Sequence, residues 1–340
     1  MGTDWELGAW GSPRWKMDSL KIEPYSSAKK DLWDAHVTAG KNSHFQFYRD
    51  YMEYHRERFT DASLLFYHGP EEELVGILPA NLYRGTLYSH QGLSFGGLVV
   101  RQGIKPPTVL RLFEGLVDHA LKLGASRLVY KALPRFYHAQ PAEEDLYALF
   151  RLGAKLYRRD ITSLVPLGGG VRFDYNRERS IKKGRDQGVE VRQSDDLPAY
   201  FEILTKVLED RHGVRPVHSL EEMQRLAKAF PQNIRLYGAF RSGRMVAGSV
   251  VYEQRHIAHA QYIANSEEGR KLCALDVLFA ELIGLYSGKM RYFDFGTSNE
   301  NDGLVLNEGL VNHKTGFGAG GAVHDYYEVD LERLKPSGQV

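Results

Sequence analysis

Two segments of this chain follow the same order of strands and helix, and this order constrains the fold more than any other feature. In each segment a short apolar hairpin containing a glycine, Gly76 or Gly248, precedes a third strand and an amphipathic helix. The predicted helices cover residues 108–123 and 274–286, where apolar residues recur with helical spacing and a glycine follows. A further strand follows each helix. The pattern predicts an α/β (α+β) chain of two tandem units, each a mixed β-sheet flanked by helices.

Three consecutive glycines, residues 168–170, predict the boundary between the two units. We therefore expect a first domain at residues 17–167 and a second at 168–334. An extension at residues 1–16 and a tail at 335–340 flank them. The length of 340 residues agrees with two domains.

Composition and charge exclude several classes of protein. Apolar residues make up 43% and aromatic residues 12% of the chain, enough for two cores and too many for a disordered protein. The net charge of +1 gives no overall field for nucleic acid or membrane. Cys273 is the only cysteine, which excludes an intrachain disulfide and is typical of a reducing cytoplasm. No apolar run is long enough for a membrane helix, and Met1–Lys16 does not read as a signal peptide.

Two motifs are compatible with ligands but occur in the wrong context. Residues 316–321 match the glycine pattern of dinucleotide sites, yet an alternating strand rather than a helix follows them. We interpret them as a glycine-rich turn. His256 and His259 are three apart on a predicted strand and so face opposite sides, which favours ordinary structural histidines. No metal site is predicted.

The segment Asn265–Cys273 lies between a predicted strand and the second amphipathic helix. Its two cations, Arg270 and Lys271, stand near a helix N-terminus, where free N–H groups and the helix dipole favour phosphate. An exposed loop with balanced charges is the alternative, and both interpretations stay open. For Cys273 a buried structural thiol is favoured over an activated one.

Asp294 lies near the end of the predicted strand at residues 291–295, in which aromatic residues flank the carboxylate. A buried carboxylate needs partners, so Asp294 is either a structural residue that binds the next loop or part of an active site. Asn307 and Glu308 follow shortly after. We predict that the three residues lie near a reacting amine and that one of the two carboxylates accepts a proton.

These motifs together resemble the GNAT acyltransferase fold, in its Fem-like branch with two tandem units. The resemblance rests on the hairpin with Gly248, the strand at residues 256–263, the segment Ser-Glu-Glu-Gly-Arg-Lys-Leu and the strand end Tyr-Phe-Asp-Phe-Gly. It extends over roughly residues 20–330. The run from residue 293 to 328 is most similar to the bacterial N-acyltransferases of O-antigen, capsule and lipopolysaccharide biosynthesis.

The resemblance implies that an acyl group passes from a coenzyme A thioester to the amine of a dTDP-linked amino dideoxysugar, with no metal. A strand pair that separates would supply backbone N–H groups for the oxyanion. The expected phosphate loop consists of Arg270, Lys271, Leu272, Cys273 and Ala274. It lacks the central glycine of the usual GNAT pattern, which leaves open which unit holds coenzyme A.

The acceptor is expected at the interface between the two units, because clefts form between domains. The residues expected to bind it are Tyr137, His138, Gln140, Lys182, Arg211, His212 and His218. A diphosphate could be met by basic residues that could equally form a solvated face: Arg172, Arg177, Lys182, Lys183, Arg211 and Arg215.

Two other functions remain open from the sequence. A Fem-like enzyme would transfer an amino acid from aminoacyl-tRNA to a peptidoglycan peptide, although the charge of +1 argues against tRNA. A binding protein that has kept the fold and lost catalysis is the other.

Overall fold

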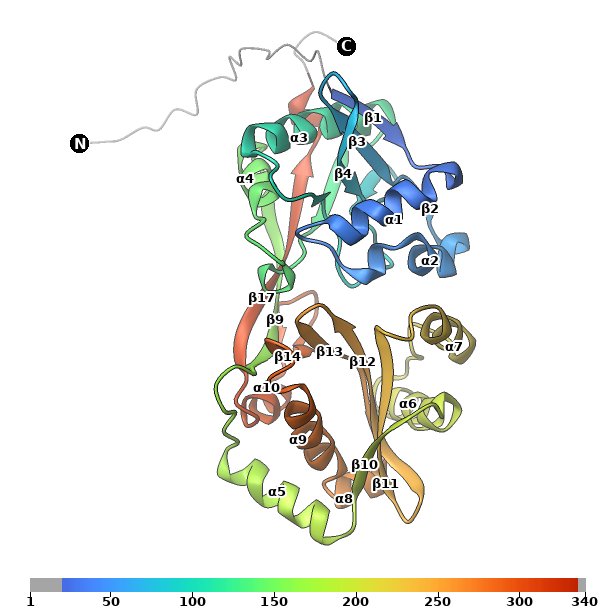
Figure 1. Cartoon of the computed structure of the whole chain (residues 1–340), viewed down its shortest axis with the longest axis vertical. Helices are drawn as coiled ribbons and strands as arrows, with labels where there is room; N and C mark the ends of the chain where they lie inside the picture. The colour runs from blue at the N-terminus through green and yellow to red at the C-terminus, as the bar shows by residue number, and fades with distance from the viewer. Residues whose placement is uncertain (1–19, 336–340) are drawn as a thin grey trace, which may run out of the picture.

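The computed structural model describes residues 20–335, arranged as two halves along its long axis (Figure 1). The expected extension at residues 1–16 and all but the first residue of the expected tail lie outside this range. The first half contains β1 (Leu20–Pro24), α1 (Lys30–Ala39), α2 (Arg49–Met52), β2 (Thr60–Asp61), β3 (Leu64–His68), β4 (Glu73–Leu78), β5 (Asn81–Tyr83), β6 (Thr86–Tyr88), β7 (Val99–Val100), α3 (Pro106–Lys122), β8 (Arg127–Lys131) and α4 (Glu144–Arg151).

Two long strands, β9 and β17, connect the halves. The second half and the connecting strands contain β9 (Lys155–Pro166), α5 (Tyr175–Asp186), β10 (Glu190–Ser194), α6 (Leu197–His212), α7 (Leu220–Ala229), β11 (Ile234–Arg241), β12 (Arg244–Gln254), β13 (Ile257–Asn265), α8 (Glu267–Lys271), α9 (Ala274–Tyr286), β14 (Tyr292–Thr297), β15 (Asn299–Glu300), β16 (Val305–Leu306), α10 (Glu308–Thr315) and β17 (Gly320–Asp330). Short 3-10 helices include η2 (Phe45–Phe47) and η4 (Arg135–Tyr137).

One mixed sheet continues through both halves, with the strand order β10-β11-β12-β13-β14-β9-β17-β8-β6-β5-β2. β9 and β17 pair along most of their length, β9 also pairs with β14 of the second half, and β17 also pairs with β8 of the first (Figure 1). The chain therefore returns to the first half at residues 326–330. A separate sheet in the first half has the order β1-β3-β4-β7. The domain boundary at residues 168–170 remains a prediction.

The mixed α/β architecture and the main helices agree with the sequence analysis. α3 and α9 occupy the two predicted amphipathic segments, and α7 begins with a capping box in which Ser219 and Glu222 bond each other's backbone. The glycine-rich residues 316–321 connect α10 to β17, as the turn interpretation expected. The third strand that the sequence predicts in the first unit is short, since β7 consists of only two residues.

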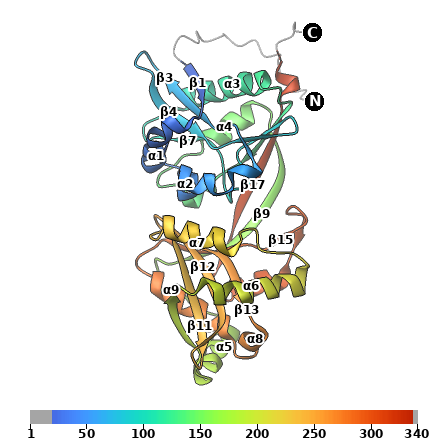
Figure 2. The same ribbon diagram turned by 90° about the vertical axis from the view of Figure 1, so that its right-hand side faces the viewer.

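Helices cover both faces of the sheet in the second half. α9, supported by α5, packs on one face through residues such as Leu278 and Phe279, while α6 packs on the other through Tyr200 (Figures 1 and 2). In the first half, Leu112 and Phe113 of α3 pack against strands of both sheets, including β3 and β8.

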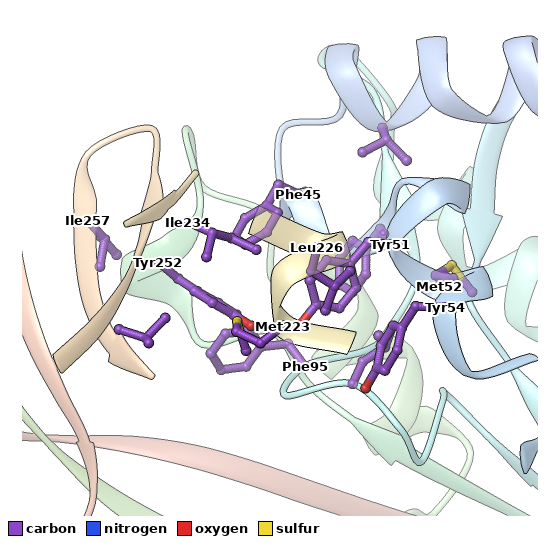
Figure 3. Packing of buried hydrophobic residues seen from close by; sticks show 14 of the residues in the cluster. Phe45, Tyr51, Met52, Tyr54, Phe95, Met223, Leu226, Ile234, Tyr252 and Ile257 are labelled. Atoms are coloured by element: carbon purple, nitrogen blue, oxygen red, sulfur yellow. Dashed lines mark hydrogen bonds between the residues drawn. The ribbon is translucent and has the colours of Figure 1, made fainter. Parts of the chain in front are cut away.

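A third apolar cluster joins the two halves. Phe45 and Tyr51 of the first half pack with Tyr252, Met223 and Leu226 of the second (Figure 3). The Tyr51 and Tyr252 hydroxyls lie 3.2 Å apart in this cluster. Because this cluster is common to both halves, we expect the described chain to unfold as one cooperative unit.

We expect Phe45→Ala to lower the free energy of unfolding by about 3–5 kcal/mol, because it removes a buried ring and leaves a cavity between the halves. The matched control is Phe150→Ala, whose ring is 75% exposed and should change stability by less than about 0.5 kcal/mol. Urea denaturation followed by circular dichroism measures both. Equal stability of the two variants, or a biphasic wild-type transition, would contradict the shared core.

Candidate active site

A pocket opens in the second half where two parallel strands separate. β13 and β14 pair only at residues 257–259 and 292–294. Beyond these, β13 continues to Asn265, whereas β14 turns away from it and stays paired with β9 as far as Thr297. The pocket has a volume of about 710 Å³ and is lined from both halves, with Phe95 contributed by the first. Its position makes the separating strands one wall and the first half the other.

A β-bulge in β13 turns a glutamine toward this pocket. The register between β12 and β13 shifts after Val250, which leaves Gln261 as an extra residue. Bulges of this kind often re-aim side chains at functional sites. Gln261 Oε1 and Asn265 Oδ1 are buried without a hydrogen-bond partner, and both residues line the pocket. These acceptors are available to N–H groups of a ligand.

Asp294 lies at the point where the strands separate, and four donors converge on its carboxylate. The Tyr137 hydroxyl donates to Oδ2 at 3.0 Å, and His259 Nδ1 lies 2.9 Å from the same oxygen. Oδ1 accepts from the Thr162 hydroxyl and from the Gly296 N–H at 2.9 Å. Each carboxylate oxygen therefore receives two hydrogen bonds. The donors come from η4, β13, β9 and β14, so Asp294 connects both halves.

The surroundings of Asp294 favour its charged form. Burial would raise its pKa, but the charge of His259 and hydrogen bonds from His259, Thr162 and Gly296 outweigh burial and hold the pKa of Asp294 below its usual value. Burial, and then the charge of Asp294, raise the pKa of Tyr137, which therefore stays protonated as a donor. Asp294 is ionised at neutral pH and is a weak proton acceptor.

His259 is oriented by this carboxylate. An ionised carboxylate only accepts hydrogen bonds, so His259 presents Nδ1–H to Asp294. In the neutral form of the ring, Nε2 then keeps a free lone pair. No other described residue forms a hydrogen bond with Nε2. His259 lines the pocket. The backbone of Gly296, which has a φ of +75°, lies close to the His259 ring: a Cβ atom at residue 296 would be 3.4 Å from His259 Cε1. The dyad thus offers a basic nitrogen to the pocket.

Lys314 of α10 holds the end of β14 in place. Its Nζ donates to the carbonyl oxygens of Gly296 at 2.8 Å and Thr297 at 2.9 Å and to Ser298 Oγ at 2.8 Å. Burial lowers the pKa of Lys314 to about 8. With all three protons used in this way, Lys314 has a structural role in shaping the pocket.

The structure does not bring Asn307 and Glu308 to this point. Asn307 caps α10, accepting from the Leu310 N–H at 3.0 Å and donating to Glu300 at 2.9 Å. Glu308 is exposed at the first residue of α10. Neither residue lines the pocket, whereas Asp294 does. The predicted group of three is therefore not assembled, because the hairpin β15–β16 places residue 308 away from the separating strands.

Of the five residues expected at the phosphate loop, only Arg270 lines the pocket, and it also lines a neighbouring pocket of about 300 Å³ beside α6. Lys271 is exposed and paired with Glu267 at 2.9 Å. Leu272 is half-buried and Ala274 is fully buried. Cys273 is half-buried at the N-cap of α9 with φ of +54°, a conformation that favours glycine.

Of the residues expected to bind the acceptor, Tyr137 reaches the site through Asp294. His138 is buried and its Nε2 lies 3.0 Å from the Leu133 oxygen, Gln140 is exposed, and His218 Nδ1 lies 2.6 Å from the Tyr262 hydroxyl. Lys182 lies exposed on α5. Arg211 and His212 end α6, and their side chains are outside the described part of the structure.

The basic residues considered for a diphosphate do not converge. Arg177 of α5 is ion-paired with Asp276, and Arg215 lies 3.6 Å from Glu209. Arg172 and Lys183 are exposed, and none of these four lines the pocket between β13 and β14. Within residues 20–335, no group of three or more His, Cys, Asp or Glu side chains is arranged to bind a metal.

Sequence reasoning missed His259 as a functional candidate. In the sequence analysis, His259 was judged only by its distance from His256 along the chain. The neighbour that matters is Asp294, which lies directly opposite His259 on β14. Aligning the two predicted strands as parallel neighbours would have paired them. Thr162 was missed because its role depends on β9 lying beside β14.

A family described as "Acetyltransferase (GNAT) domain" matches residues 172–302, which include β13, the α8–α9 segment and β14. The matched residues lie within the second half of the structure. This match contains both residues of the His259–Asp294 dyad. No curated protein matches the chain.

Three solved structures share the fold over most of this chain. FemX has a TM-score of 0.65 at 12% identity, covering 92% of this chain and 98% of its own. L-PGS from Bacillus licheniformis has a TM-score of 0.59 at 12% identity, covering 92% and 94%. The C-terminal domain of a putative lysylphosphatidylglycerol synthetase from Agrobacterium fabrum has a TM-score of 0.51 at 13% identity, covering 76% and 84%. Such identities show the common fold alone. Across residues 20–335, no helix has the length and apolar character required to cross a membrane.

Proposed function

We propose that the protein is an N-acyltransferase that moves an acyl group from a coenzyme A thioester to the amine of a dTDP-linked amino sugar. The observation that carries the proposal is the His259–Asp294 dyad at the point where β13 and β14 separate, inside the GNAT-type domain. Strands that separate provide space for a linear thioester arm together with unpaired backbone groups. The acceptor class rests on the resemblance of residues 293–328.

In the proposed reaction the neutral amine attacks the thioester carbonyl, and a tetrahedral oxyanion forms. His259 Nε2 accepts the proton that the nitrogen loses, and Asp294 orients the ring and stabilises its charged form. The C–S bond then breaks, the amide is released, and the proton is transferred to the leaving thiolate. Asp294 acts here as a positioning residue, since its own oxygens are fully engaged.

The pocket offers suitable contacts for an acyl-CoA donor. Gln261 Oε1 and Asn265 Oδ1 are unpartnered acceptors, and the pantetheine arm of coenzyme A carries amide N–H groups. Arg270, which lines both adjoining pockets, provides a cation for the diphosphate. The rest of the expected phosphate loop would contribute backbone groups at the break between α8 and α9.

We expect Arg270→Ala to weaken acetyl-CoA binding about tenfold or more, because a charge-assisted contact with phosphate is lost. Isothermal titration calorimetry measures the dissociation constant. Arg225→Ala is the matched control, since Arg225 is exposed on α7 and outside the pocket. Unchanged affinity in Arg270→Ala would move the donor away from this pocket, and a wild-type protein without affinity for acetyl-CoA would overturn the donor assignment.

A Fem-like transfer from aminoacyl-tRNA is the second candidate function. The observation in its favour is the similarity to FemX over 98% of that chain. The two candidates differ in their donor. Turnover with aminoacyl-tRNA and none with acyl-CoA would replace the first proposal by the second.

A further inference from the structure

The two connecting strands present a row of polar side chains to the first-half end of the pocket. Alternate residues of a strand share a face, so Arg158, Asp160 and Thr162 of β9 lie on one side. His324 pairs with Asp160, and Tyr326 with Arg158, on the neighbouring strand β17. All five line the pocket.

The intervening residues face the opposite side of the same strand pair. There Arg159 pairs with Asp325, with Nε 2.6 Å from Oδ1. This opposite face provides a natural comparison, because it contains the same arginine–aspartate combination outside the pocket.

Arg158 and Asp160 form a two-pronged ion pair. The Arg158 Nε lies 3.1 Å from Oδ1 and its Nη2 lies 2.8 Å from Oδ2 of Asp160. Arg158 also donates to Asp302 at 2.7 Å, which ties the β15–β16 hairpin to β9. The Asp160 side chain is only 2% exposed. Arg158 and the Tyr326 hydroxyl together engage the two oxygens of Asp160. The carboxylate is therefore held in a fixed orientation at the pocket wall, where its negative charge attracts hydroxyl donors.

Aromatic rings surround this pair. The His324 ring lies 4.7 Å from Tyr326 and 5.2 Å from Phe95 by ring centroids, and the Arg158 guanidinium lies 4.6 Å from the centre of Tyr326. His324 is 95% buried, at a relative exposure of 5%, and its Nε2 has no hydrogen-bond partner. Burial, then the charges of Lys131 and Arg158, lower the pKa of His324 to about 3. The ring is thus neutral and can both donate and accept.

We infer that this face is the subsite for the sugar ring of the acceptor, with Asp160 and His324 recognising its hydroxyl groups and Phe95 and Tyr326 its apolar face. The inference rests on the proposed acyl transfer and names residues that select the acceptor. A sugar ring has both an apolar face and hydroxyls that donate and accept. The subsite has the complementary groups: rings, a carboxylate, a guanidinium and an unpartnered imidazole nitrogen.

The spacing along β9 fits this assignment. Thr162 donates to Asp294, where the amine reacts, and Asp160 lies two residues along the same face. Two strand residues span about 6.6 Å, which suits a six-membered ring with one substituent. An amine near the dyad would place hydroxyls of the opposite ring edge near Asp160 and His324.

The experiment compares wild type with Asp160→Asn and His324→Phe, using a dTDP-linked amino sugar, the free amino sugar and cyclohexylamine as acceptors. Cyclohexylamine has the ring and the amine without hydroxyls. Calorimetry measures acceptor and acetyl-CoA affinities separately, and initial rates give the acceptor KM. Asp325→Asn is the matched control on the opposite face. His324→Phe keeps a ring in place if Asp160→Asn fails to fold.

We expect wild type to bind the free amino sugar more tightly than cyclohexylamine. In both variants the ratio of these two affinities should fall about 10- to 100-fold. Their acetyl-CoA affinity and the behaviour of Asp325→Asn should match wild type. Wild-type affinity for cyclohexylamine equal to that for the sugar, or unchanged selectivity in His324→Phe, would overturn the subsite. Absent acetyl-CoA binding with intact sugar selectivity would instead count against the proposed donor and leave the subsite supported.

Discussion

A His259→Ala variant is expected to lose about 10²- to 10⁴-fold in kcat at neutral pH, the range that a positioned proton acceptor contributes. The imidazole has Nδ1 engaged by Asp294 and Nε2 free, so it is the group in the pocket best suited to accept the amine proton. The loss should shrink at high pH, where the amine deprotonates without help. Measuring kcat across roughly pH 6 to 10 with acetyl-CoA and a dTDP-linked amino sugar tests this.

Two further variants separate chemistry from structure. Asp294→Asn should lower kcat more than it changes the acceptor KM, because the amide no longer enforces the Nδ1–H tautomer. Tyr137→Phe removes one of four donors to the same carboxylate and should have a smaller effect. Wild-type kcat in His259→Ala at every pH would assign the proton to solvent. If kcat in Asp294→Asn falls only in proportion to the folded fraction, the carboxylate is a structural anchor.

The second large effect is a loss of stability in mild acid. Burial lowers the pKa of several histidines far below 6.5, to about 4 for four of them and about 3 for the last: His36, His55, His138, His218 and His324. Between about pH 6.5 and pH 4 the unfolded chain binds protons at these positions and the folded chain does not. Stability therefore falls as the pH decreases, by up to about 1.4 kcal/mol per pH unit for each histidine.

One carboxyl group opposes this trend. Burial raises the pKa of Asp145 to about 6, so the folded chain binds a proton there that the unfolded chain releases. This offsets about one of the histidines. The net loss of unfolding free energy from the other histidines is comparable with the stability of an ordinary domain, about 5–15 kcal/mol. We therefore expect the protein to unfold near pH 5.

Urea denaturation at pH 7, 6 and 5 gives the number of protons taken up on unfolding from the slope of the unfolding free energy against pH. His138→Gln removes one buried imidazole and should reduce this uptake by about one proton. His313→Gln is the control, because His313 is partly exposed. A stability that stays level from pH 7 to pH 5 would contradict the buried, neutral state of these side chains.

Local patterns were sufficient for the helices and for the class of fold. The apolar periodicity of α3 and α9 and the Ser219–Glu222 capping box involve residues within a few positions of each other, so a sequence shows them directly. The match at residues 172–302 agrees with the GNAT resemblance seen in the same region. Asp294 could also be singled out, because a carboxylate inside an apolar strand needs partners wherever the strand lies.

The identity of those partners required the tertiary structure. Tyr137, Thr162 and His259 are 157, 132 and 35 positions from Asp294 in the chain. Alternation along a strand shows which residues share a face, but not which strand lies beside it or in which register. For the same reason Glu308, close in sequence, lies outside the pocket, whereas Asp160 and His324 meet because β9 and β17 pair across both halves. The sequence by itself determined the elements and the family resemblance, and the pairing of distant strands decided the site.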